Sequence, residues 1–215
     1  MLREEQNRLL KGLINHLDLK TNVDAGGIMR TPADTYTCED RFNLEWESFF
    51  KNHPQIIGLS GDLAEPNSFL TVEEFGSSII AARDSEGKFK AYANVCSHRG
   101  AQVEQEKRGI KSKFSCPFHG WTFDNNGDLV GYPKSEHFGE IDKDCYGLKE
   151  LPSLEKHGFL WVHPNADGEI NLDDLLGGKL EQEFEAWDFD RLVLSNEDEY
   201  QTEMNWKLAI DTFGE

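Results

Sequence analysis

The stretch CSHRGAQVEQEKRGIKSKFSCPFHGW, residues 96–121, begins and ends with a short cluster that offers one thiol and one imidazole. The first cluster holds Cys96 and His98, and the second holds Cys116 and His119. Within each cluster one or two residues separate the Cys from the His, so both side chains can face one bound species. The clusters are 17 residues apart, and all four side chains together form a candidate metal site.

Two kinds of metal site use two Cys and two His ligands. A structural zinc ion binds such a set tetrahedrally, but zinc sites commonly take Cys with Cys from one element and His with His from another. A Rieske 2Fe-2S cluster takes both thiolates on one iron and both imidazoles on the other. Because each loop here supplies one ligand of each kind, the sequence favours the Rieske cluster, with zinc as the alternative.

The neighbours of the four ligands fit a cluster that is shielded from water. Gly100 and Gly120 let the backbone turn closely around the cluster and present N–H groups to sulfur, and Pro117 stiffens the second loop. Phe118 and Trp121 are expected to limit the access of water. Each of these residues alone could equally be an ordinary turn glycine or core aromatic residue. They support a metal cluster only in combination with the four ligands.

The composition limits the possible partners. Forty acidic residues against 22 basic ones give a formal charge of −18, which repels nucleic acid and anionic lipid. No stretch approaches the roughly 18 to 20 apolar residues of a membrane helix, and the N-terminus lacks the apolar region of a secretion signal. We therefore expect a cytoplasmic protein that binds neither nucleic acid nor membranes.

The region between the clusters departs from this acidic character. Residues 96–115 carry five basic side chains and two acidic ones, a local charge of 5 − 2 = +3. These residues are Arg99, Lys107, Arg108, Lys111 and Lys113, with Glu104 and Glu106. The region is either a solvated loop or a docking surface for an acidic partner.

The remaining cysteines and histidines show no ligand spacing. A cytosolic chain keeps its thiols reduced, so disulfides are not expected, and Cys38 and Cys145 are interpreted as ordinary thiols. The histidines outside the two clusters are expected to be surface or hydrogen-bonded residues: His16, His53, His137, His157 and His163.

Apolar spacing predicts an amphipathic helix over residues 1–17, a linker over 19–36 and a second helix over 42–52. Residues 55–163 then show short β-type runs separated by turns, with Asn126-Gly127 as a hairpin signal in which both residues take positive φ. This pattern predicts a compact antiparallel β domain. The runs are QIIGLS, SFLTVEEF, SSIIAARD, KFKAYANV, KSKFSC, GWTFD, GDLVG and GFLWVHP.

After residue 163 the pattern predicts a loop, a helix, a strand over 191–203 and a helix over 205–215 that no cap or breaker ends. We therefore expect a fragment of a longer protein. The expected domains are an N-terminal helix and arm (1–40), the cluster domain (41–165) and a linker with the beginning of a further domain (166–215).

The motif Cys-x-His-x17-Cys-x2-His, with CSHRG and CPFHGW, resembles the Rieske domain of ring-hydroxylating and related non-haem iron oxygenases. The similarity runs from about Tyr36 to the closing NWKLAIDTFGE. It implies an α+β fold, mainly antiparallel β: a Rieske-type β-sandwich with N-terminal helices and the start of a C-terminal α/β catalytic domain. Ala101 and Phe118 stand where respiratory Rieske proteins carry extra cysteines, which implies the low-potential branch, at about −150 mV.

The resemblance also implies ligand roles and an activity. Cys96 and Cys116 would bind one iron of the cluster, and the two histidines the other. The cluster would pass electrons from a reductase or ferredoxin to a mononuclear non-haem Fe(II), which activates dioxygen to hydroxylate a substrate in a homotrimeric enzyme.

The ligands of that Fe(II) would lie beyond residue 215, so only the full-length protein would hold it. Glu215 matches the carboxylate that bridges the two metal sites between subunits, although many members have Asp there and Asn where this chain has Thr212. Two alternatives stay open: a free-standing Rieske ferredoxin, and a zinc-stabilised interaction module.

Overall fold

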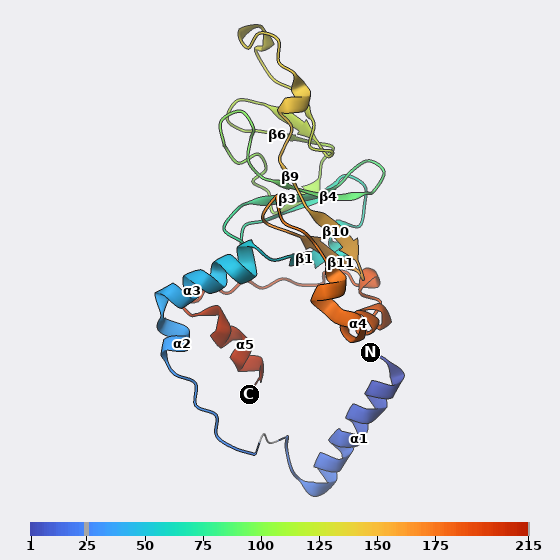
Figure 1. Ribbon diagram of the computed structural model, residues 1–215. Helices are drawn as coiled ribbons and strands as arrows, with labels where there is room; N and C mark the ends of the chain where they lie inside the picture. The colour runs from blue at the N-terminus through green and yellow to red at the C-terminus, as the bar shows by residue number, and fades with distance from the viewer. Residues whose placement is uncertain (24–25, 215) are drawn as a thin grey trace.

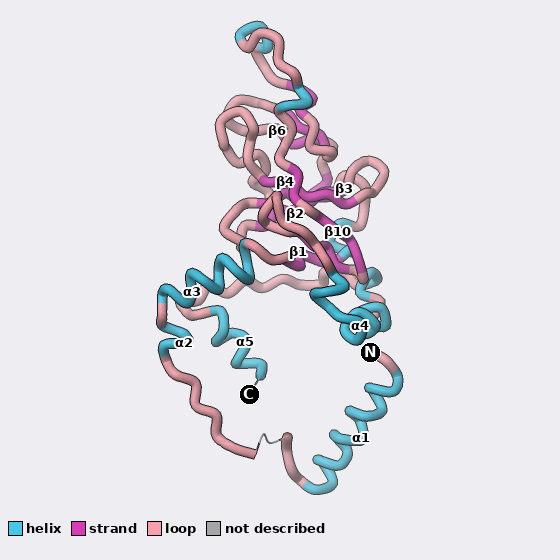
Figure 2. The backbone as a smooth tube through the Cα atoms, viewed as in Figure 1, coloured by secondary structure: helices cyan, strands magenta, loops and turns pink. Residues whose placement is uncertain are grey.

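The computed structural model describes residues 1–23 and 26–214. Three antiparallel sheets are stacked in the upper and middle part of the view, and helices lie below them (Figure 1). Loops join most of the short strands (Figure 2). Glu215, the expected bridging carboxylate, lies outside the described residues.

The three sheets account for the strands of the described chain. Their orders are β1-β11-β10, β5-β2-β3-β4-β9 and β6-β7-β8. The bounds are β1 (Gln55–Leu59), β2 (Ser68–Val72), β3 (Ile79–Arg83), β4 (Phe89–Ala93), β5 (Arg108–Ile110), β6 (Lys113–Ser115), β7 (Thr122–Asp124), β8 (Leu129–Gly131), β9 (Glu150–Leu151), β10 (Ser153–Lys156) and β11 (Phe159–Val162).

The middle sheet is buried on both faces because its strands are apolar at successive positions. Ile80 packs into a core shared with the sheet β6-β7-β8, and the preceding Ile79 packs into a second core shared with the sheet β1-β11-β10. Phe69 and Leu70 divide between the two cores in the same way. Adjacent strand residues point to opposite faces, so this continuous apolar run specifies a central layer. The first core also contains Cys96 and Cys116.

All eight predicted β-type runs contain strands, and the expected mainly antiparallel β fold is confirmed. The turn at Asn126-Gly127 joins β7 to β8 as predicted, but only Gly127 has a positive φ, of 81°. Asp124 accepts hydrogen bonds through its carboxylate from the N–H groups of Asn126 and Asp128 at 2.9 and 3.1 Å. This side chain therefore sets a longer turn than the predicted two-residue one.

The predicted N-terminal helices are present. The first is α1 (Arg3–Leu19), followed by α2 (Asp34–Thr37), α3 (Glu39–Glu45) and a π-helical turn η1 (Trp46–Lys51). The helix α1 has no buried residue, and it extends away from the sheets (Figure 1). Its apolar face does not contribute to either core. None of the described helices is long and apolar enough to cross a membrane.

The segment after β11 contains α4 (Leu172–Ala186), the short helix η5 (Phe189–Arg191) and α5 (Trp206–Gly214). Short 3-10 helices also occur at η2 (Ser60–Leu63), η3 (Ser135–His137) and η4 (Lys143–Cys145). The predicted strand over 191–203 is wrong, because no regular element lies between η5 and α5. Acidic side chains instead attach this segment to basic ones on and next to β5.

The helix α5 packs against the N-terminal helices rather than the sheets. The Trp206 indole donates a hydrogen bond to Glu45 at 3.1 Å, and the Tyr36 hydroxyl donates one to Asp211 at 2.6 Å. Lys207 forms an ion pair with the same Glu45 carboxylate. Segments from the two ends of the chain therefore form one helical unit below the sheets (Figure 1).

Candidate metal centre

The two predicted ligand loops have the same backbone hydrogen bonds. The Cys96 N–H donates to the Ala101 carbonyl at 2.8 Å, and the Cys116 N–H donates to the Trp121 carbonyl at the same distance. The glycine four residues after each Cys donates back to the Cys carbonyl at 2.9 Å, closing the turn. One loop follows β4 and the other joins β6 to β7, so the sheets hold two copies of one turn near each other.

Both loops contain a glycine whose backbone conformation disfavours other residues. Gly100 has φ 75° and Gly120 has φ 72°, the left-handed region that favours glycine. The sequence-based expectation that their N–H groups face sulfur is wrong, because these groups donate to the carbonyls of Cys96 and Cys116. The N–H groups directed to the Cys96 sulfur are those of His98 and Arg99.

The two glycines give a matched pair of substitutions. Gly100→Ala is expected to lower the free energy of unfolding by about 1 to 2 kcal/mol, the cost of a left-handed residue with a Cβ, because open space surrounds that Cβ. Gly120→Ala is expected to cost more, because its Cβ would lie 3.0 Å from Pro133 Cγ. Denaturant unfolding of both variants measures the difference. Equal losses would contradict the packing argument.

The thiols lie inside the protein and one imidazole lies at its surface. Cys96 and Cys116 are each 3% exposed, His98 is partly buried and His119 is exposed. The His98 and His119 rings are 4.8 Å apart between centroids, and the Cys116 thiol is close enough to hydrogen-bond with that of Cys96. The candidate ligands are therefore paired by kind, sulfur with sulfur and imidazole with imidazole.

The protonation equilibria reflect this burial. Burial raises the pKa of the Cys96 thiol, and the neighbouring Cys116 thiol also raises it, while the backbone N–H groups of His98 and Arg99 lower it. Burial, the His119 ring and the Arg99 guanidinium lower the pKa of His98. The lowered pKa keeps this imidazole neutral, which is the state that binds metal.

The spacing of the donor atoms separates the two kinds of metal site. A tetrahedral zinc ion would bring its sulfur and nitrogen ligands to within about 4 Å of one another. No three of these four donor atoms lie within 4.8 Å of one another in the part of the chain that the structure describes. Two like pairs set apart fit a group with two metals, with sulfur on one and nitrogen on the other.

An aromatic wall, formed by Trp121, Tyr132, Phe138 and Tyr146, covers the His98 side of the site. The Trp121 ring stacks on His98 at 4.8 Å with an interplanar angle of 7°, and Phe138 contacts both rings edge-on at 5.7 and 5.8 Å. Phe138 belongs to the segment between β8 and β9, yellow at the top of Figure 1. The prediction that Trp121 limits water fits its 2% exposure, whereas Phe118 is 60% exposed and covers little.

Removing Phe138 is expected to change the electrochemistry of the site without unfolding the chain, because this side chain is 39% exposed. In Phe138→Ala, water reaches His98 and stabilises the more negative reduced state of a bound cluster, so the reduction potential rises. A redox titration followed by EPR measures it, with Phe213→Ala, a change at another exposed phenylalanine, as the control. An unchanged or lower potential would contradict this role.

A buried hydrogen-bond network that the sequence did not indicate fixes the first loop. Asn94 is 1% exposed, and its side-chain oxygen Oδ1 accepts hydrogen bonds from the backbone N–H groups of Val103 and Glu104 at 3.0 and 2.9 Å. The hydroxyl of Ser97 donates to the Tyr146 carbonyl at 2.6 Å and ties the same loop to the aromatic wall. Asn94 lies outside the ligand motif and Ser97 fills its variable position, and the side chains of both bind backbone groups that only the fold brings near.

The basic region between the clusters is largely neutralised within the chain. Lys107 pairs with Glu199 at 2.8 Å, and Arg108 pairs with Glu197 at 2.9 Å. Lys111 lies between two carboxylates, those of Glu104 and Glu106. Of the five basic residues, only Arg99 and Lys113 have no carboxylate partner among the described residues. The local charge of +3 of residues 96–115 therefore does not form one continuous surface of unpaired basic side chains.

The cysteines and histidines outside the two clusters were predicted to be ordinary thiols and surface or hydrogen-bonded residues. Cys38 and Cys145 are free thiols, and the Asp142 carboxylate raises the pKa of Cys145. His16, His53 and His163 each have a hydrogen-bond partner. His157 is also hydrogen-bonded, to Glu181, and it lies in a cluster with two glutamates on α4.

Comparison with known proteins agrees with this geometry. Residues 53–152 match the family described as "Rieske [2Fe-2S] domain". The chain is 32% identical to the anthranilate 1,2-dioxygenase large subunit of Acinetobacter baylyi, covering 70% of this chain and 32% of that protein. It is 29% identical to the carnitine monooxygenase oxygenase subunit of Acinetobacter baumannii, covering 86% and 50%.

A solved structure of a quaternary ammonium Rieske monooxygenase superimposes with a TM-score of 0.76 at 27% identity, covering 86% of this chain and 52% of that one. The chain thus spans half or less of the length of the two curated relatives. The match to a Rieske domain implies a 2Fe-2S cluster.

Proposed function

Because the chain belongs to the Rieske oxygenase family, we propose that it is the electron-transferring part of an oxygenase component. The proposed domains are the N-terminal helix and arm (1–40), the Rieske domain (41–165) and a linker with the beginning of a catalytic domain (166–215). The pairing of buried thiols and outer imidazoles on twin loops is the observation that carries this proposal.

In this proposal Cys96 and Cys116 bind one iron of the 2Fe-2S cluster, and His98 and His119 bind the other. The cluster supplies a site that holds one electron at a time. The protein contributes the shape of the site: the core holds the two thiolates, the aromatic wall keeps water from His98, and His119 stays exposed. His119 is thus the ligand through which a partner can approach most closely.

A reductase or ferredoxin is the proposed electron donor. Arg99 and Phe118, which form a cation–π contact at 5.6 Å beside His119, are the proposed docking residues, since the other basic side chains are mostly paired. In the full-length protein, a homotrimer in this proposal, Glu215 would link His119 to a mononuclear iron site of a neighbouring subunit. Dioxygen activation and substrate hydroxylation would take place there.

A free-standing electron carrier is the second candidate, and the helical unit argues against it. The helix α5 is attached to the N-terminal helices through Asn205, Trp206 and Lys207, and these contacts lie outside the sheets that hold the cluster loops. The match to one oxygenase relative covers 86% of the chain, which is more than the Rieske domain match over residues 53–152. An electron carrier alone would not need this unit.

Reconstitution with iron and sulfide tests the proposal. We expect a red-brown protein with about two irons and two sulfides per chain, which takes up one electron and then shows a Rieske-type EPR spectrum. The donor interaction is tested by the salt dependence of the reduction rate in the parent and in Arg99→Gln. A colourless protein that binds one zinc ion and takes up no electron would overturn the proposal.

A further inference from the structure

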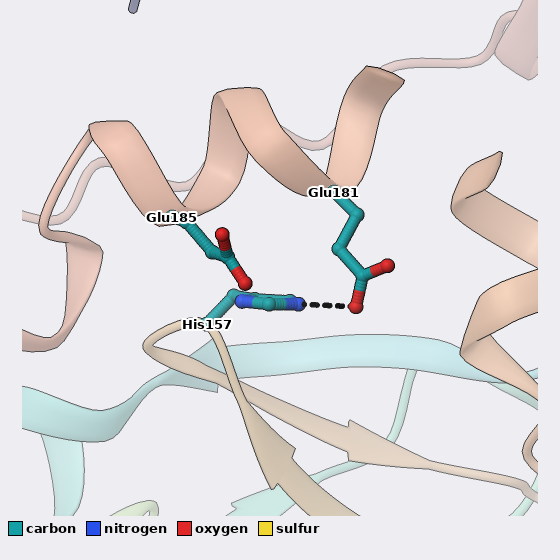
Figure 3. Close-up of side chains that lie close together, drawn as sticks. All are labelled: His157, Glu181 and Glu185. Atoms are coloured by element: carbon teal, nitrogen blue, oxygen red, sulfur yellow. Dashed lines mark hydrogen bonds and ion pairs between the residues drawn. The ribbon is translucent and has the colours of Figure 1, made fainter. Parts of the chain in front are cut away.

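A second group of potential metal ligands lies where α4 packs on the turn between β10 and β11 (Figure 3). It consists of His157 from the turn and Glu181 and Glu185 from one face of the helix. One donor atom from each of the three lies within 4.8 Å of the other two. Among the described residues, no other His, Cys, Asp or Glu set of three meets this condition.

The backbone places the His157 ring before any ion binds. His157 and Gly158 have φ values of 57° and 77°, as in a two-residue hairpin turn. A side chain at Gly158 would collide with the backbone of Phe189 and Asp190, so the turn is pressed against the segment that follows α4. The His157 side chain is only 7% exposed, and its position therefore costs little further entropy on binding.

The charged side chains around the His157 ring are net negative, which favours binding of a cation. Lys156 pairs with Glu181 at 2.6 Å and lies 3.8 Å from Asp173. The carboxylates of Asp173, Glu181 and Glu185 outnumber the single ammonium group of Lys156 by two charges. A divalent ion would balance this excess.

We propose that His157, Glu181 and Glu185 form a binding site for a divalent transition-metal ion of the Zn²⁺ type. The distance from His157 Nε2 to Glu181 Oε1 is 3.1 Å, close to the separation of about 3.3 Å between ligands of a tetrahedral zinc ion. Imidazole with carboxylates suits zinc, whereas Ca²⁺ and Mg²⁺ take oxygen ligands. Water would complete the coordination.

Lys156 competes with the ion for Glu181. Its side chain is 36% exposed, so it can turn toward solvent or toward Asp173 when the ion binds. The bound ion would then fasten α4 to the β10–β11 turn in place of the present hydrogen bond and ion pair. This site is separate from the cysteine loops and does not depend on the function proposed for them.

Calorimetric titration of the cluster-loaded chain with Zn²⁺ tests the site, and the visible absorption of the cluster shows that zinc has not displaced iron. We expect one Zn²⁺ to bind per chain. His157→Gln and Glu185→Gln should each weaken binding at least tenfold, whereas His137→Gln and Glu169→Gln, at exposed positions, should leave it unchanged.

Lys156 provides an independent test. Lys156→Met should tighten binding at least threefold, because it removes the competing ammonium group, and should do so more than Lys179→Met, the same charge change elsewhere on α4. Absence of binding, or a dissociation constant unaffected by His157→Gln, would overturn the site. Equal effects of the two lysine substitutions would show general attraction to the acidic surface and would overturn it as well.

Discussion

Replacing Cys116 by alanine is expected to abolish the cluster: the iron content should fall from about two atoms per chain to less than about a tenth of that value. Cys96 and Cys116 are the two buried thiols of the first core, and among the described residues no third thiol lies there to replace Cys116. One iron would keep a single protein sulfur ligand, which is not enough to hold it against exchange with solvent. Iron and sulfide determination after desalting measures the loss.

The matched control is Cys145→Ala. Cys145 is an exposed free thiol that belongs to neither loop, so its removal should leave the iron content and the visible spectrum unchanged. Far-UV circular dichroism of both variants separates loss of the cluster from loss of the fold. A folded Cys116→Ala chain that retains two irons would show that this residue is not a ligand.

The double substitution His98→Cys with His119→Cys is expected to lower the reduction potential by about 250 mV or more, the difference between the low end of Rieske potentials and all-cysteine clusters. Two neutral imidazoles would be replaced by two thiolates. The added negative charge disfavours the reduced state of the cluster, which carries one more negative charge than the oxidised state. A redox titration monitored by EPR measures the shift.

The control for this prediction is His137→Cys, at an exposed histidine of the short helix η3. It introduces a thiol without changing the ligand set, so the potential should stay within experimental error. The prediction fails if the double variant binds two irons at the parent potential, because the imidazoles would then not be ligands.

The sequence predicted the parts of this molecule that depend on local pattern. The run IIAA at residues 79–82 is apolar on both faces of its strand, and it occupies the central layer between two cores. The spacing of the four candidate ligands predicted that one thiol and one imidazole come from each loop, and the structure places the two imidazole rings 4.8 Å apart. The two loops have the same backbone hydrogen bonds and therefore need glycine at the same position, since both Gly100 and Gly120 have positive φ.

The parts that the sequence did not predict depend on contacts between distant residues. Strand β5 is three residues long and contains a glycine, so no periodic signal marks it. Phe138 contacts His98 although the two residues are 40 positions apart in the sequence, and the sequence around Phe138 resembles an ordinary turn. Lys107 and Arg108 were expected in a solvated loop or a docking surface, yet glutamates about ninety residues later neutralise them.

The predicted strand over residues 191–203 was wrong for a related reason. Leu192, Val193 and Leu194 suggest a strand, but the acidic residues that follow bind basic side chains instead of pairing their backbone with a sheet. Side-chain charge pairing over long sequence separations leaves no mark in a short window of sequence.

A Mössbauer spectrum of the chain loaded with iron-57 tests the central claim most directly, because it reports the ligands of each iron separately. We expect two iron sites in equal amounts with different isomer shifts, one with thiolate and sulfide ligands and one with imidazole and sulfide ligands. On reduction by one electron, only one of the two sites should become ferrous. Two identical iron sites, or a single mononuclear site, would contradict the account.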